Sequence, residues 1–161
     1  MSASAADGEH LRRAIELATQ ARGRGNRPFG ALIVDADGKV LAEAEADSTI
    51  TGDCTGHAET NALRRLAGRG VARERMAGCT MYCSAEPCVM CAGAIFFGNI
   101  RRVVYGIDAV TLRRYRGQRP EQRDLALSCR DVFRASPHAI EVIGPYLEVE
   151  AHKPHDGFWK T

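Results

Sequence analysis

Pro87-Cys88-Val89-Met90-Cys91 and His57-Ala58-Glu59 are the two stretches that decide how this chain folds and what it can do. Each of them opens a segment with apolar residues at helical spacing, residues 88–97 and residues 57–68. Proline suits the first turn of a helix, because its missing N–H would have no partner there. We therefore expect both stretches to lie at helix N-termini.

The residue types and their spacing predict a metal site. Cys88 and Cys91 are three residues apart, which places both sulfurs on one face of a helix. His57 from the other helix would be a third ligand and would leave one tetrahedral position open to water, as in catalytic zinc sites. A structural zinc ribbon would need a fourth ligand at matched spacing, and none is evident. Cys54 could approach the metal, but a turn explains it equally well.

Glu59 is the candidate catalytic carboxylate. If the helix were already formed at His57, the side chain of Glu59 would be turned by about 200° from it. If His57 instead caps the helix, both side chains can reach one pocket. Zinc lowers the pKa of a bound water to about 7. Glu59 could then take a proton from that water and return it to a substrate.

The remaining sequence alternates helical and strand patterns. The expected helices cover residues 8–22, 57–68, 88–97, 123–134 and 145–153. The expected strands cover residues 31–34, 39–46, 80–83, 102–106 and 140–143. Polar, irregular segments are expected over residues 47–56 and 107–122. This order predicts an α/β fold, a three-layer α/β/α sandwich over a mixed five-stranded sheet, with residues 1–161 forming one domain.

Composition narrows the class of protein. Of the 161 residues 45% are hydrophobic, and the net charge of +2 is too small to indicate nucleic-acid binding. No apolar run approaches the roughly 20 residues of a membrane span, and the start lacks the pattern of a secretory signal. A Cys-x-x-Cys without such a signal favours metal binding in a reducing cytoplasm over disulfides. The arginines between Arg113 and Arg119 are interpreted as a solvated face or a subunit contact.

The motifs resemble the cytidine and deoxycytidylate deaminase superfamily, specifically its branch of bacterial guanine deaminases, fungal-type cytosine deaminases and tRNA adenosine deaminases. The resemblance is carried by four segments: Arg27-Pro28-Phe29-Gly30-Ala31, Gly56-His57-Ala58-Glu59, residues 85–94 and Arg102-Val103-Val104-Tyr105-Gly106. It implies a cytidine deaminase-like fold, one zinc ion on His57, Cys88 and Cys91, and Glu59 as the shuttle that moves protons to the ring nitrogen and the departing ammonia. It also implies that Phe29 lines the base pocket, that the backbone around Ala58 and Cys88 meets the base, and that the protein is a homodimer.

Two further segments bear on the substrate. The base-binding Asn of the family is expected near residue 46, where Ala46 and Asp47 stand, and Asp47 could replace it by accepting hydrogen bonds. The tail His155-Asp156-Gly157-Phe158-Trp159 resembles the aromatic segment that closes over the site in free-base deaminases. Asp156, Phe158 and Trp159 are thus candidate substrate contacts, although they could equally dock on the core or on a partner subunit. We expect a nucleobase or nucleoside of guanine or cytosine type as substrate, with tRNA adenosine as the alternative.

Overall fold

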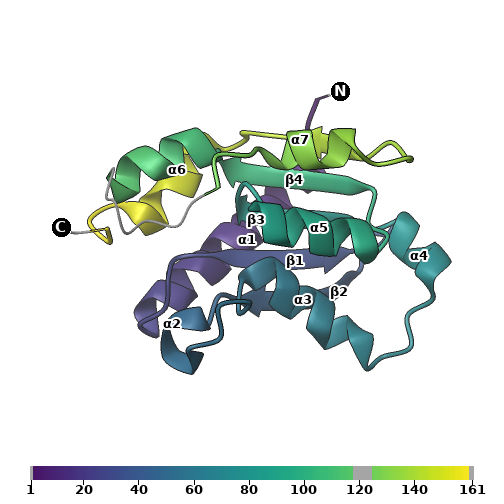
Figure 1. The fold of residues 1–161 in the computed structure, drawn as a ribbon, viewed down its shortest axis with the longest axis horizontal. Coiled ribbons are helices and arrows are strands. Elements are labelled where there is room, and N and C mark those ends of the chain that lie inside the picture. Colours follow the sequence, from purple (N-terminus) through teal and green to yellow (C-terminus); the bar gives the residue numbers. More distant parts are fainter. Residues whose placement is uncertain (1, 118–124, 160–161) are drawn as a thin grey trace.

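The computed structural model describes residues 2–117 and 125–159 (Figure 1). In chain order its elements are α1 (Ala5–Gly23), β1 (Gly30–Val34), β2 (Val40–Glu45), α2 (Ser48–Thr51), α3 (Ala58–Ala67), α4 (Arg73–Ala77), β3 (Thr80–Ala85), α5 (Val89–Phe97), β4 (Arg102–Ile107), α6 (Ala109–Arg116), α7 (Cys129–Arg134), β5 (Glu141–Ile143), α8 (Glu148–His152) and a 3₁₀ turn (Lys153–His155). Over the described residues, none of the helices combines the length and the apolar character needed to cross a lipid bilayer.

The strands form one five-stranded sheet in the order β2-β1-β3-β4-β5. β1 pairs antiparallel with both β2 and β3, whereas β3 with β4 and β4 with β5 are parallel. Parallel neighbours need a crossover connection, and α5 supplies it between β3 and β4 (Figure 1). The mixed five-stranded sheet expected from the sequence is confirmed.

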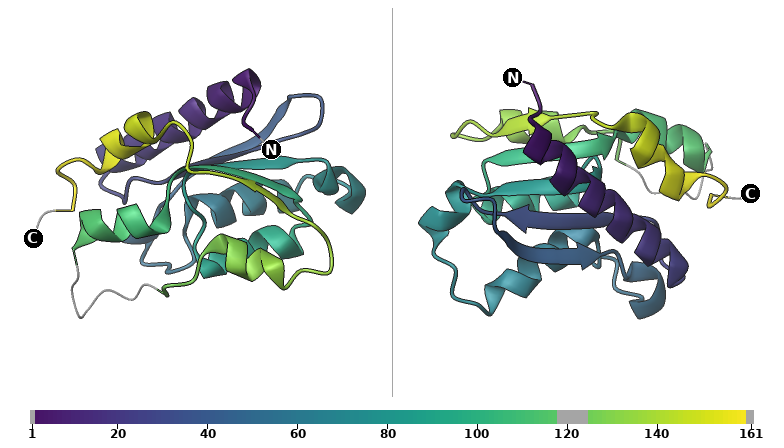
Figure 2. Two further views of the ribbon diagram at one scale, coloured as in Figure 1. Left: turned by 90° about the horizontal axis from the view of Figure 1, so that it is seen from above. Right: turned by 180° about the vertical axis from the view of Figure 1, so that it is seen from behind.

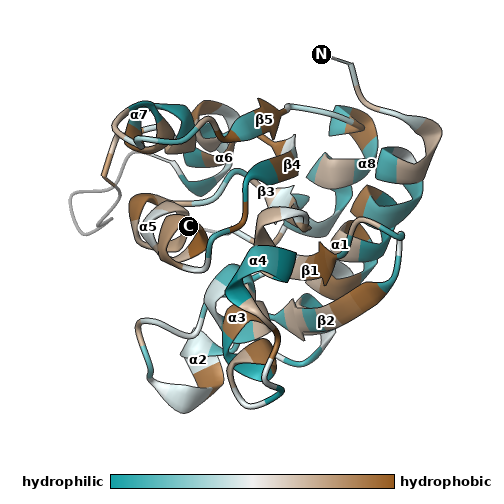
Figure 3. Ribbon diagram, turned by 90° about the vertical axis from the view of Figure 1, so that its right-hand side faces the viewer, coloured by the Kyte–Doolittle hydropathy of each residue, from teal (hydrophilic) through white to brown (hydrophobic). Residues whose placement is uncertain are grey.

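Helices cover both faces of this sheet, with α1 and α8 on one face and α3, α5 and α7 on the other (Figure 2). Side chains alternate between the two faces along each strand. On β1, Ile33 packs with the core under α3 and α5, whereas Leu32 and Val34 pack with the core under α1. Burial on both faces accounts for the apolar run of β1, whose arrowhead end is brown in Figure 3.

A buried carboxylate fixes α1 against the sheet. Ser4 caps the helix, and Asp7 completes a capping box with it. The Asp7 side chain, in a residue only 2% exposed, accepts hydrogen bonds from Tyr82 Oη at 2.7 Å and from Arg102 at 2.6 and 2.9 Å. Arg102 is the main reason why the pKa of Asp7 lies far below its ordinary value. This cluster joins α1 to β3 and β4.

Four of the sequence-based expectations are wrong in part. Residues 47–56, expected to be irregular, include the short helix α2 (Ser48–Thr51). Residues 109–116, expected to be irregular, form α6, because Asp108 caps the helix by accepting a hydrogen bond from Thr111 N at 2.8 Å. The helix expected over residues 123–134 begins only at Cys129, after the cap residue Ser128; residues 118–124 lie outside the described residues. The helix expected over residues 145–153 begins only at Glu148, because Leu147 has a left-handed backbone (φ 52°).

Candidate active site

The expected metal ligands lie at the N-termini of two neighbouring helices. His57 is the N-cap residue of α3 and Cys88 is the N-cap residue of α5, both with extended backbones. Cys91 lies in the first turn of α5. α5 follows directly from the carboxyl end of β3, so the cluster lies where ligands bind in open α/β sheets.

The three ligand atoms are spaced as zinc requires. His57 Nδ1 lies 3.6 Å from Cys88 Sγ and 3.5 Å from Cys91 Sγ, and the three atoms lie within 4.8 Å of one another. Tetrahedral zinc, with Zn–S of about 2.3 Å and Zn–N of about 2.0 Å, would separate such a nitrogen and sulfur by about 3.6 Å. The residues therefore fit the metal and leave one position for a further ligand. Among the described residues, no other group of His, Cys, Asp and Glu has this spacing.

Glu59 lies in the first turn of α3, two residues after the cap. Because His57 has an extended backbone rather than a helical one, the side chains of His57 and Glu59 both reach the same cavity. Glu59 is 7% exposed, and its Oε2 accepts a hydrogen bond from Cys91 Sγ at 3.4 Å. Burial raises the pKa of the Glu59 carboxyl above its ordinary value. A carboxyl group in this environment exchanges protons closer to neutral pH.

The two cysteines have different environments. The neighbouring Cys91 thiol, together with His57, lowers the pKa of Cys88 to about 4. The Cys88 sulfur and burial raise the pKa of Cys91. In turn, Cys88 raises the pKa of His57. The lowered pKa of Cys88 favours its thiolate, which is the form that binds metal.

A cavity of 280 Å³ opens at this cluster. His57, Glu59 and Cys88 line it together with Phe29, which stands directly before β1. The Ala58 side chain is fully buried in the core beside the cavity. Cys54 lines the cavity but does not belong to the metal-ligand group.

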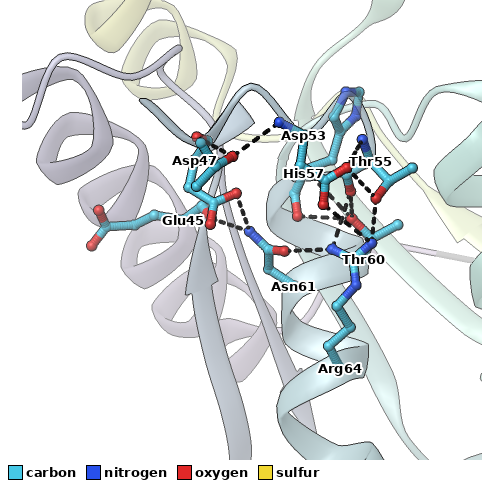
Figure 4. A network of polar contacts seen from close by, with 9 residues as sticks. Glu45, Asp47, Asp53, Thr55, His57, Thr60, Asn61 and Arg64 are labelled. Atoms are coloured by element: carbon cyan, nitrogen blue, oxygen red, sulfur yellow. Dashed lines mark hydrogen bonds and ion pairs between the residues drawn. The ribbon is translucent and has the colours of Figure 1, made fainter. Parts of the chain in front are cut away.

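Asp47 does not line this cavity, although its neighbours Ala46 and Ser48 do. Its Oδ1 instead accepts a hydrogen bond from Asn61 Nδ2 at 2.9 Å (Figure 4). The carboxylate is thus directed toward α3 and takes part in a network of polar contacts that extends to the loop before His57.

The C-terminal tail lies behind the wall of the cavity. The Trp159 ring lies 6.1 Å from the Phe29 ring and donates a hydrogen bond to His155 Nδ1 at 3.1 Å. The Arg116 guanidinium lies 4.8 Å from the Trp159 ring and 5.6 Å from the Phe29 ring, and Arg116 and Phe29 both line the cavity. Phe158 packs at the edge of Trp159. The tail therefore supports cavity residues from behind.

Asp156 is held on the outside of the tail. Its Oδ1 accepts a hydrogen bond from Tyr115 Oη at 2.9 Å, and its carbonyl accepts one from Arg22 Nη1 at 2.7 Å. Arg22 Nη1 also donates to the carbonyl of Pro154 at 3.0 Å. Arg22 on α1 thus holds the tail through two of its backbone carbonyls.

Sequence reasoning missed Ser48, Arg27 and Glu86 as residues of the cavity. Glu86 accepts hydrogen bonds from Ala109 N, Ser128 Oγ and Cys129 N, at 2.9, 2.6 and 3.0 Å, and so joins the start of α6 to the start of α7. Its place directly before Pro87, within residues 85–94 that carry the family resemblance, was the signal that could have found it. For Ser48, the nearest signal in the sequence was the base-binding position expected at Ala46 and Asp47, and Ala46 does line the cavity.

Comparison with known proteins identifies the family. Residues 4–107 match the model of the cytidine and deoxycytidylate deaminase zinc-binding region. The chain belongs to this family. The match includes His57, Glu59, Cys88 and Cys91, so the family expected from the motifs is confirmed. The protein is a zinc-dependent hydrolytic deaminase, with zinc as its cofactor.

Its relatives act on different substrates. The chain is 42% identical over 150 residues to a probable cytosine deaminase of Schizosaccharomyces pombe, covering 93% of this chain and 90% of that protein. A solved structure from work on A-to-I editing by tRNA:A34 deaminases superposes with a TM-score of 0.71 at 30% identity, covering 91% of this chain and 99% of the other. Guanine deaminase from Bacillus subtilis superposes with a TM-score of 0.62 at 35% identity, covering 66% and 68%.

Proposed function

We propose that this deaminase acts on a free nucleobase or nucleoside of guanine or cytosine type and releases ammonia. The observation that carries the proposal is the buried Glu59 beside the three metal-ligand atoms, in a 280 Å³ cavity whose wall includes the aromatic ring of Phe29. A flat heterocycle stacks well on such a ring.

The proposed reaction replaces the exocyclic C–N bond of the substrate with a C–O bond from water. Zinc, when bound, supplies an activated water as the nucleophile. Glu59 takes one proton from that water and delivers it to the ring nitrogen. It then carries the second proton to the departing amino group, which leaves as ammonia. The raised pKa of Glu59 suits both the uptake and the release of a proton.

Two observations support a small substrate. The relative from Schizosaccharomyces pombe, named a probable cytosine deaminase, matches nearly the whole length of this chain. Trp159 of the aromatic tail packs behind Phe29 and closes this side of the cavity. A closed wall keeps bulk water away from the base. Asp156, Phe158 and Trp159 are proposed to act by holding this wall.

Deamination of adenosine in tRNA is the second candidate. It is favoured by the superposition on a structure from work on tRNA:A34 deaminases, which covers 91% of this chain. Arg27 and Arg113 also line the cavity. Within residues 2–117 and 125–159, neither of their side chains forms a hydrogen bond or an ion pair. Free guanidinium groups beside a base pocket are available to RNA phosphates. This candidate requires tRNA binding that weakens steeply with salt.

We also propose a homodimer in a reducing cytoplasm. Phe97 on α5 is 75% exposed beside an apolar groove between α3 and α5, lined by Leu63, Val71 and Met76 among others. A second copy would bury this surface. All six cysteines are free, as a reducing compartment requires. Light scattering of Phe97→Asp against wild type tests the dimer: a smaller mass for the variant is expected, and a monomeric wild type would contradict it.

Ammonia release tests the function directly. The purified zinc enzyme is incubated with cytosine, guanine, adenine, their nucleosides and a tRNA transcript. We expect release from a free base or nucleoside of cytosine or guanine type. Release from tRNA alone would replace the first candidate with the second. If protein shown to hold zinc released no ammonia from any of these compounds, both candidate functions would be contradicted.

A further inference from the structure

The turn from the end of β2 into the start of α2, residues 46–48, presents alternate residues to the active-site cavity. Ala46 and Ser48 line the cavity, whereas the carboxylate of Asp47 between them is held by Asn61 on α3. The Asp47 carboxylate is therefore directed away from the cavity that its two neighbours line.

Close packing keeps Asp47 in this orientation. Its backbone N–H and that of Ser48 both donate to the carbonyl of Gly56, at 3.0 and 3.2 Å. A Cβ atom on Gly56 would lie only 2.3 Å from Asp47 Oδ1, so the carboxylate occupies space that any other residue at position 56 would fill. Gly56 directly precedes the metal ligand His57.

Asn61 connects this segment to the loop before His57 by a second route. Its Nδ2 also donates to the carbonyl of Glu45, the last residue of β2, at 3.0 Å. Its Oδ1 accepts from Arg64 Nη1 at 2.7 Å, and Arg64 donates in turn to the carbonyl and the hydroxyl of Thr55. Figure 4 shows the continuous chain of contacts from Glu45 to Thr55. The side chains of Asn61 and Arg64 therefore connect β2 and Asp47 to the loop before His57 through α3.

We infer that Asn61 is a positioning residue for the deamination reaction and that Asp47 is its partner. Together they fix the cavity wall at Ala46 and Ser48 and the loop that presents His57 to the metal, without contact between Asp47 and the substrate. Hydrogen-bond partners outside the ligand shell commonly set the orientation of metal ligands. The inference rests on the proposed function where activity is the readout, and on the zinc site alone where zinc affinity is the readout.

A direct contact between Asp47 and the base is the competing explanation, and Asp47→Asn separates the two. The Asn side chain keeps a carbonyl oxygen that can accept from Asn61, but it loses the charge and gains a donor. A positioning role tolerates that exchange. A carboxylate that accepts hydrogen bonds from the base does not.

The experiment compares Asp47→Ala, Asp47→Asn, Asn61→Leu and the double variant Asp47→Ala/Asn61→Leu. Arg65→Gln is the matched control, because Arg65 also joins α3 to β2, by donating to the carbonyl of Glu43, but does not reach the His57 loop. Zinc affinity is measured by competition with a chelator, and kcat and KM are measured on the best substrate of the panel. Thermal unfolding is recorded for every variant.

We expect Asp47→Ala and Asn61→Leu each to lower zinc affinity and kcat by about tenfold or more. The double variant should be no worse than Asn61→Leu, because the Asp47 carboxylate acts through its contact with Asn61. Asp47→Asn and Arg65→Gln should stay within about twofold of wild type. Should Asn61→Leu fail to fold, the contrast between Asp47→Ala and Asp47→Asn alone decides.

Two results would overturn the inference. An Asp47→Asn enzyme with normal zinc affinity but a changed substrate preference or a raised KM would show a substrate contact. Normal zinc affinity and kcat in Asn61→Leu and in Asp47→Ala would show that the network positions nothing. The zinc affinities test the inference even if the enzyme turns over no substrate of the panel. Failure of the proposed function and failure of this inference can therefore be told apart.

Discussion

Arg102 on β4 donates to both carboxylate oxygens of Asp7 on α1, at 2.6 and 2.9 Å, in a largely buried contact. Arg102 holds the folded-state pKa of Asp7 below its ordinary value of 3.8. The unfolded chain therefore takes up a proton at Asp7 before the folded protein does as pH falls. The stabilisation is complete above about pH 4 and is lost as pH falls further, through the folded-state pKa.

Replacing Asp7 by Asn should lower the free energy of unfolding at pH 7 by about 2 kcal/mol, because the partly buried Arg102 guanidinium loses the more buried of its two anionic partners. The difference between wild type and variant should shrink below about pH 4. Urea unfolding across pH measures both effects. Glu141→Gln is the control, since Glu141 contacts Arg102 at 3.0 Å but is more exposed than Asp7. An equal loss in the two variants, or a difference that does not depend on pH, would contradict this account.

Cys88→Ala should lose most zinc binding and part of the stability, because metal binding to such a site is coupled to folding. Cys54→Ala is a close control: Cys54 lines the same cavity but does not belong to the ligand group. It should keep stoichiometric zinc and a normal melting temperature. Metal analysis by mass spectrometry and thermal unfolding with and without chelator report the result. Full zinc in Cys88→Ala, or loss of zinc in Cys54→Ala, would refute the ligand assignment.

Trp159→Ala should raise KM for the base by roughly three- to tenfold while zinc content stays unchanged. The indole ring backs Phe29 and lies beside the Arg116 guanidinium, and such aromatic contacts contribute about 0.5–1.5 kcal/mol each. Trp159→Phe keeps a ring in this place and should recover most of the loss. Steady-state kinetics of both variants test the prediction. Unchanged kinetics in Trp159→Ala would leave the tail with a packing role only.

The metal cluster could be predicted because its determinants are short-range. The spacing of Cys88 and Cys91, the proline before them and the helical pattern after His57 each lie within a few residues of the ligands they position. The capping position of His57 also decides that Glu59 reaches the cavity, and the sequence had left that point open. The central strand β1 could be predicted as well, because its burial on both faces requires a continuous apolar run in the sequence.

The orientation of Asp47 could not be predicted in the same way. It depends on Asn61, fourteen residues along the chain, and on the space that Gly56 leaves open. Glu86 likewise acts through backbone groups of Ala109 and Cys129, which only the folded chain brings together. The helix α6 was within reach of sequence reasoning, since Asp is a favoured N-cap residue and Asp108 stands at that position.

Glu59→Gln tests the central claim most directly. The variant keeps the size and shape of the side chain, and Glu59 is not one of the three metal-ligand residues, so the metal site should stay intact. Zinc content and ammonia release are measured on the same preparations of variant and wild type. The account predicts one zinc per chain in both proteins, with ammonia release from the base lowered by about 10²- to 10⁴-fold in the variant. Ammonia release at the wild-type rate from a zinc-loaded Glu59→Gln enzyme would show that Glu59 is not the proton shuttle.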